Sequence, residues 1–282
     1  MSVLPTSSPS PSAPALIERS VGLVGPAGTL VNAKVVDTQV GQRTLVFLHG
    51  LVGLNDHWEG VVNLVKQRYR CVMLEIPLLQ LRNEDCSIDG VASLTVRFLK
   101  DYVKCPATLI GNSFGGHVAL RIALSNPELV DSLVLAGSSG IIEKSMVSDL
   151  MLRPSREWLA RKIGELFYDP DEHMNQADLD RAHRELSDRA CARAMVRLSR
   201  TARRNHLGQQ MTKVTAPTLL LWGKQDIVTP PEAAERFEKM LPNPRLVWID
   251  RCGHAPMIEK PREFARALID FVDSLENPED DA

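Results

Sequence analysis

Short, continuous apolar segments alternate along this chain with segments of helical periodicity. The strand-like segments cover residues 44–48, 69–74, 108–110, 130–135, 218–222 and 245–249. The helical segments cover residues 58–67, 88–103, 114–125, 231–240 and 262–275. Strands that are apolar throughout are buried on both faces, which is typical of a parallel sheet covered by helices. The pattern therefore predicts an α/β fold with a mostly parallel central sheet and helices on both faces.

The alternation stops between residues 140 and 213, where charged, helix-compatible stretches occur without a clear strand. We interpret this segment as a helical lid inserted into a core formed by residues 19–139 and 214–276. An antiparallel opening strand is expected over residues 30–36. Residues 1–18, which are rich in Ser and Pro, are predicted to form a disordered tail. Ligands bind beyond the carboxyl ends of the strands in such sheets, so the lid is expected to cover the site.

The composition is that of a soluble globular protein, because 44% of its 282 residues are hydrophobic and 24% are charged. The net charge of −2 gives no indication of a nucleic-acid partner. No segment approaches the roughly 18 apolar residues of a membrane span, and the N-terminus lacks the apolar stretch of a secretory signal. Five cysteines without paired spacing favour reduced thiols and a cytoplasmic location, and they form no metal-binding pattern.

A Gly-Asn-Ser-Phe-Gly motif spans residues 111–115, between a predicted strand and a predicted helix. By itself, this pattern also fits an ordinary glycine-rich turn. The strand before it and the helix after it favour a sharp turn that exposes the serine hydroxyl, in which bulkier side chains at the glycine positions would collide. The serine would also lie at a helix N-terminus, where backbone N–H groups face developing negative charge. Ser113 is therefore the predicted nucleophile.

Residues 111–116 resemble the nucleophile elbow of the α/β-hydrolase family. The resemblance extends over residues 36–274, except for the lid. It implies a histidine base after the last strand and an acid after the preceding strand. It also implies a loop after an early strand that gives one backbone N–H to an oxyanion hole. No cofactor is implied.

Two residues match the implied base and acid. His254 follows the last predicted strand, within Cys-Gly-His-Ala-Pro, and would remove the proton of Ser113. Asp226 follows the strand at 218–222 and would hold the tautomer of His254 and stabilise its protonated form. A surface histidine and a turn aspartate are the alternative interpretations. Some family members carry the acid one strand earlier, but residues 136–139 contain no carboxylate.

A His-Gly-Leu segment at residues 49–51 follows the strand at 44–48. In the family, the matching loop and the residue after the nucleophile give the two backbone N–H groups of the oxyanion hole. The matching groups here are the amides of Leu51 and Phe114. The resemblance implies that Ser113 forms a covalent acyl-enzyme that water then releases.

Three further residues are candidates for the substrate pocket, although core packing would also explain them: Trp58, Met146 and Met151. The arginines of residues 181–204 number eight, and we interpret them as a solvated face of the lid rather than a site for an anionic substrate or partner. The sequence does not determine the oligomeric state.

The leading hypothesis is a serine esterase that hydrolyses carboxylic esters of small or medium acyl substrates. The Gly-Asn-Ser elbow is also similar to that of C–C bond hydrolases acting on ring-cleavage-type diketones. The Ala-Pro pair after His254 is more similar to the esterase branch. A non-catalytic ligand-binding receptor of the same fold is the third interpretation, because a fold by itself does not define a function.

Overall fold

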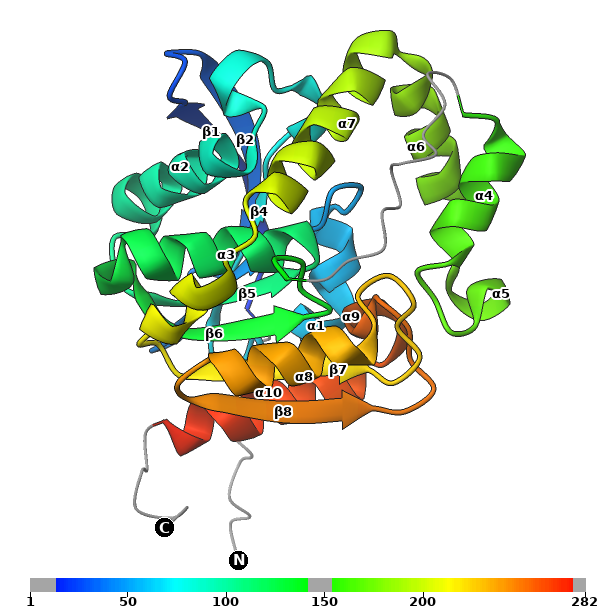
Figure 1. Cartoon of the computed structure of the whole chain (residues 1–282). Coiled ribbons are helices and arrows are strands. Elements are labelled where there is room, and N and C mark those ends of the chain that lie inside the picture. Colours follow the sequence, from blue (N-terminus) through cyan, green and yellow to red (C-terminus); the bar gives the residue numbers. More distant parts are fainter. Residues whose placement is uncertain (1–13, 142–153, 276–282) are drawn as a thin grey trace, which may run out of the picture.

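The computed structural model describes residues 14–141 and 154–275, and within them one eight-stranded sheet has the order β1-β2-β4-β3-β5-β6-β7-β8. The strands are β1 (Ile17–Val24), β2 (Leu30–Asp37), β3 (Thr44–Leu48), β4 (Arg70–Glu75), β5 (Ala107–Asn112), β6 (Val130–Ala136), β7 (Thr218–Gly223) and β8 (Pro244–Ile249). β2 pairs antiparallel with β1 and with β4, and all other neighbouring strands are parallel. The predicted α/β fold with a mostly parallel sheet is confirmed (Figure 1).

β1 is a strand that the sequence pattern did not predict. All eight of its residues pair with β2, yet Leu23 is its only buried residue. Backbone hydrogen bonds therefore define this edge strand, and its side chains lack the alternation of a half-buried strand. Ile17 and Glu18 belong to the sheet, whereas the sequence pattern assigned them to the N-terminal tail.

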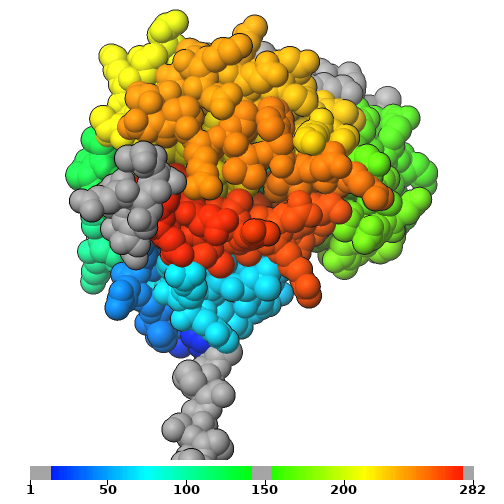
Figure 2. Space-filling model, turned by 90° about the horizontal axis from the view of Figure 1, so that it is seen from below, coloured from blue at the N-terminus to red at the C-terminus, as the bar shows by residue number. Residues whose placement is uncertain are grey.

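Helices cover both faces of the sheet. One face carries α1 (Glu59–Val65) and α10 (Pro261–Ser274), and the other carries α2 (Ile88–Phe98), α3 (Phe114–Ser125) and α8 (Pro231–Met240). Successive side chains of β3 point to opposite faces of the sheet. Leu45 and Phe47 belong to the apolar cluster on the face of α1 and α10, whereas Val46 and Leu48 belong to the cluster on the face of α2, α3 and α8. Figure 2 shows α10, in red, on the face that it covers together with α1.

We call the segment between β6 and β7 the insertion, and its described part contains four α-helices. They are α4 (Arg156–Gly164), α5 (Pro170–His173), α6 (Gln176–Ser187) and α7 (Arg189–Arg204). Each helix begins after a side chain that accepts a backbone N–H of its first turn, and these caps are Ser155, Asp169, Asn175 and Asp188. Figure 1 shows α4, α5 and α6 on the side toward which β6 and β8 point, which is the carboxyl end of these strands.

The remaining short elements connect these layers: η1 (Asn55–Trp58), η2 (Leu78–Gln80), η3 (Asn83–Asp85), η4 (Leu99–Val103), η5 (Pro127–Leu129), η6 (Gly208–Lys213) and α9 (Pro256–Glu259). The arginines of α7 at positions 189, 193, 197, 200, 203 and 204 are exposed, as expected for a solvated face, whereas Arg181 of α6 is only partly exposed. Among the described helices, none is both long enough and apolar enough to cross a membrane.

Candidate active site

Ser113 occupies the sharp turn between β5 and α3. Its backbone has φ 54° and ψ −118°, a region that non-glycine residues rarely adopt and that marks local strain. The turn is held from both sides, because Ser113 N donates to Ala136 O at 3.1 Å and Ser113 O accepts from Gly116 N at 3.1 Å. The surrounding structure therefore fixes the serine in the conformation predicted for a nucleophile elbow.

The two glycines of the motif are needed because backbone atoms approach them closely. A Cβ at Gly111 would lie 2.4 Å from the carbonyl carbon of Gly115. A Cβ at Gly115 would lie 2.3 Å from the carbonyl oxygen of Leu48, at the end of β3. Real Cβ contacts are longer than this, so any side chain would push α3 away from the sheet.

We expect Gly115→Ala to lower the free energy of unfolding by about 3 kcal/mol, because the clash is with backbone that cannot rotate away. Urea denaturation, followed by circular dichroism, measures this change. Gly164→Ala is the matched control, because its Cβ would meet only Pro170 Cβ at 3.5 Å. Equal denaturation midpoints for the two variants would contradict the argument.

His254 and Asp226 meet beyond the carboxyl ends of β7 and β8. The Nδ1 atom of His254 lies 2.8 Å from Oδ2 of Asp226. The two side chains are only 5% and 0% exposed, so the interaction is shielded from water. Thr229 Oγ1 also donates to Oδ2, at 2.7 Å. The carboxylate therefore engages Nδ1 of His254, and the other ring nitrogen, Nε2, is not among its partners.

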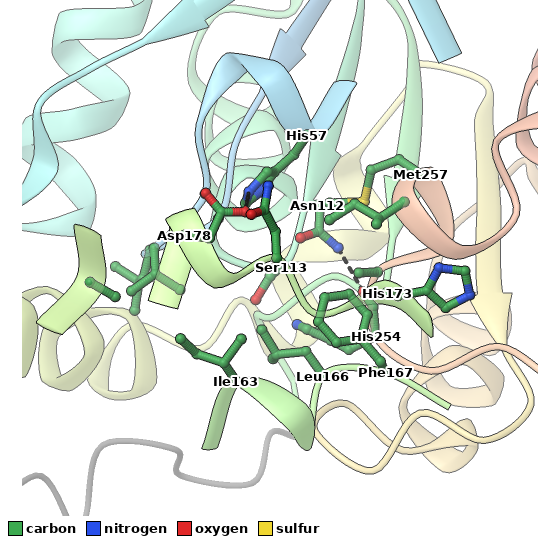
Figure 3. A pocket seen from close by; sticks show the side chains of 18 of the residues that line it. His57, Asn112, Ser113, Ile163, Leu166, Phe167, His173, Asp178, His254 and Met257 are labelled. Carbon is green, nitrogen blue, oxygen red and sulfur yellow. Dashed lines mark hydrogen bonds and ion pairs between the residues drawn. The ribbon is translucent and has the colours of Figure 1, made fainter. Parts of the chain in front are cut away.

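A cavity of about 520 Å³ lies between the core and the insertion, and both Ser113 and His254 line it. The insertion contributes the apolar side chains of Trp158, Leu159, Ile163, Leu166, Phe167, Leu186 and Met195. Figure 3 shows Ser113 and His254 near Ile163 and Leu166. The structure thus brings the predicted nucleophile and the predicted base to one cavity. The predicted acid, Asp226, does not line the cavity and contacts His254 through its Nδ1 atom.

The polar lining of the cavity includes a contact between a histidine and an aspartate that the sequence did not indicate. His57 Nε2 lies 3.1 Å from Asp178 Oδ2, and the His57 interaction lowers the pKa of the Asp178 carboxyl. Arg181 contacts the same carboxylate at 3.3 Å and donates to Val52 O at 3.2 Å. These contacts tie α6 to the loop after β3. Only the fold brings positions so distant in sequence together.

Trp58 does not line the cavity, so its predicted role is wrong. Its side chain is fully buried and packs between Phe47 and Phe264, with ring centroids 5.3 Å and 5.8 Å away. The neighbouring His57 points into the cavity instead. Met146 and Met151 lie outside the described residues.

The loop after β3 lies beside the nucleophile, and Leu51 lines the same cavity as Ser113. Neither the amide of Leu51 nor that of Phe114 donates to a backbone acceptor among the described residues. His49 is buried, and its Nδ1 lies 2.7 Å from Gly50 O; burial lowers its pKa. His117 does not line the cavity, and burial lowers its pKa to about 3. Neither of these histidines is placed to serve as the base.

The comparisons with known proteins agree with this architecture. A sequence profile described as "Alpha/beta hydrolase family" matches residues 45–267. The pimeloyl-[acyl-carrier protein] methyl ester esterase of Nitrosomonas europaea is 29% identical over 245 residues, covering 81% of this chain and 95% of that protein. A 2-hydroxy-6-oxononadienedioate/2-hydroxy-6-oxononatrienedioate hydrolase of Cupriavidus pinatubonensis is 29% identical over 265 residues, covering 84% and 89% respectively.

A solved structure is similar over most of the chain. It is that of MGS-MChE2, an alpha/beta hydrolase enzyme from the metagenome of sediments from the lagoon of Mar Chica, Morocco. It has 29% sequence identity and a TM-score of 0.69, and the match covers 86% of this chain and 96% of that one. Together with the family profile, this shows that the chain belongs to the alpha/beta hydrolase family and is a hydrolase enzyme of that family.

Proposed function

We propose that this protein is a serine hydrolase that cleaves carboxylic esters of small or medium acyl substrates. The observation that carries the proposal is the 2.8 Å contact between His254 Nδ1 and Asp226 Oδ2, beside a cavity that Ser113 also lines. A buried acid that accepts from Nδ1 keeps Nε2 unprotonated, which is the tautomer that can remove a serine proton.

In the proposed reaction, His254 takes the hydroxyl proton while Ser113 Oγ attacks the acyl carbon. The amides of Leu51 and Phe114 stabilise the resulting oxyanion. The protonated His254 then gives its proton to the departing alkoxide, and an acyl-enzyme remains on Ser113. Water attacks this ester with His254 again as base, which releases the acid and restores the free serine.

The lining of the cavity supports an ester with an apolar acyl group. Most of the side chains from the insertion are aliphatic or aromatic, and such surface favours a hydrocarbon chain over a charged group. The cations Lys162 and Arg181 also line it, but each already contacts a carboxylate, Glu165 at 3.1 Å and Asp178 at 3.3 Å. The N. europaea relative, which is named as a methyl ester esterase, agrees with this class of substrate.

Hydrolysis of a C–C bond in ring-cleavage-type diketones is the second candidate. The C. pinatubonensis relative, named as a hydrolase of such compounds, favours it. The Asn112 side chain of the elbow does not strengthen this candidate. Its Nδ2 already donates to Ala136 O at 3.0 Å and to His254 O at 2.9 Å, so the amide holds the base loop against the elbow.

A substrate panel tests the proposed function. We expect turnover of p-nitrophenyl esters, from acetyl to palmitoyl, with an optimum at short or medium chains, and no cleavage of a 2-hydroxy-6-oxo-dienoate. Ile163→Trp should shift the optimum toward shorter chains, because Ile163 lines the cavity. Cleavage of the dienoate alone would replace the ester proposal with the C–C one. Binding without turnover of either class would instead indicate a receptor.

A further inference from the structure

Glu259, the last residue of α9, is a carboxylate buried at the junction between the core and the insertion. The residue is only 5% exposed. A buried carboxylate is costly unless its oxygens accept hydrogen bonds, so its partners indicate what it does. Nothing in the local sequence distinguishes this carboxylate, because Glu259 precedes Lys260 and Pro261 in a segment typical of a helix start.

The two oxygens of Glu259 accept backbone N–H groups from two different parts of the fold. Oε1 accepts from Gly253 N at 2.8 Å, next to the proposed base. Oε2 accepts from Tyr168 N at 2.7 Å, in the insertion. Both distances lie in the normal range of N–H···O hydrogen bonds. Glu259 therefore joins the loop that carries His254 to the chain that follows α4.

The same two segments also contact each other directly. His254 N donates to Leu166 O at 2.7 Å. A Cβ at Gly253 would lie 2.7 Å from Leu166 O and 2.9 Å from Tyr168 N, so only glycine allows this approach. Leu166 and Phe167, between these contacts, direct their side chains into the cavity near His254 (Figure 3). The segment that lines the cavity thus also holds the backbone of the proposed base.

We propose that Glu259 is a positioning residue that fixes His254 by clamping its loop to residues 166–168 of the insertion. This inference rests on the proposed serine-hydrolase function. Glu259 does not line the cavity, so it acts on the reaction only through the placement of His254. A displacement of about 1 Å in a catalytic group can reduce a rate about 100-fold, so loss of the clamp should be visible in catalysis.

The test compares Glu259→Gln with the control Glu263→Gln, which changes an exposed acid of the neighbouring helix α10. Glutamine keeps the shape of Glu259 but has only one acceptor oxygen, so one of the two amides loses its partner. For Glu259→Gln we expect kcat on the best ester to fall about 10- to 100-fold with KM unchanged. The rate constant for labelling of Ser113 by a fluorophosphonate should fall in parallel, while Glu263→Gln matches the wild type.

Thermal unfolding is recorded for each variant, and kinetics are compared where all are fully folded. A lower melting temperature with wild-type kcat and labelling rate would overturn the proposal, because it would show a purely structural role. If Glu259→Gln does not fold, Gly253→Ala provides the second test, since its Cβ forces residues 166–168 away. That variant must also lower kcat and the rate constant for labelling, or the proposal fails. Wild-type activity in Ser113→Ala would instead refute the underlying function.

Discussion

Ser113→Ala is expected to lower kcat for ester hydrolysis by about 10⁶-fold, because it removes the oxygen that attacks the acyl carbon in the proposed mechanism. Residual turnover should still exceed that of water, since the amides of Leu51 and Phe114 would continue to stabilise an oxyanion formed by attack of water. The measurement is the initial rate with the best p-nitrophenyl ester. Intact-protein mass spectrometry after acid quenching should detect an acyl adduct on the wild type and none on the variant.

Ser125→Ala is the matched control for this experiment. Ser125 is the last residue of the same helix, α3, and its exposed hydroxyl lies within hydrogen-bond distance of two acceptors, Arg121 O and Asn126 Oδ1. The control should retain wild-type turnover and the acyl adduct. A Ser113→Ala protein that keeps more than a tenth of wild-type kcat would show that another group carries the chemistry.

The sheet could be predicted because its strands are short and apolar throughout. The segment at 44–48 coincides with β3, and the helix at 114–125 coincides with α3. In such elements local composition and tertiary burial agree. β1 lacked this agreement, since only Leu23 is buried and pairing with β2 fixes the other residues. No pattern within residues 17–24 indicates a strand that is held by backbone hydrogen bonds to a partner strand and not by burial of its side chains.

The order of motifs along the chain predicted at which strand ends Ser113, Asp226 and His254 lie, whereas the walls of the cavity could not be predicted. Trp58 and His57 show the reason. They are adjacent in sequence, so their side chains leave the helical turn in different directions, and only one of the two side chains faces the cavity. Phe264, which completes the packing around Trp58, lies in α10, the last of the described helices. Such distant partners leave no local signal.

Asp226→Asn is expected to fold normally and to lower kcat by about 10⁴-fold. The reason lies in the hydrogen bonds that surround the carboxylate. Oδ1 accepts from Val228 N at 2.8 Å and from Thr229 N at 2.9 Å, and both donors are fixed in the backbone. The carbonyl oxygen of the new amide must therefore occupy this position, because its NH₂ group would face two N–H donors there.

The NH₂ group of the new amide is then directed at His254 Nδ1, where Oδ2 now lies 2.8 Å away. A donor at that point forces Nδ1 to accept, so the ring proton moves to Nε2 and His254 can no longer remove the proton of Ser113. Thr229→Val is the comparator, because it removes the hydroxyl that donates to Oδ2 but keeps the carboxylate. It should lower the free energy of unfolding by about 1–3 kcal/mol and leave most of kcat intact. Similar kcat values for the two variants would mean that Asp226 does not act through the tautomer of His254.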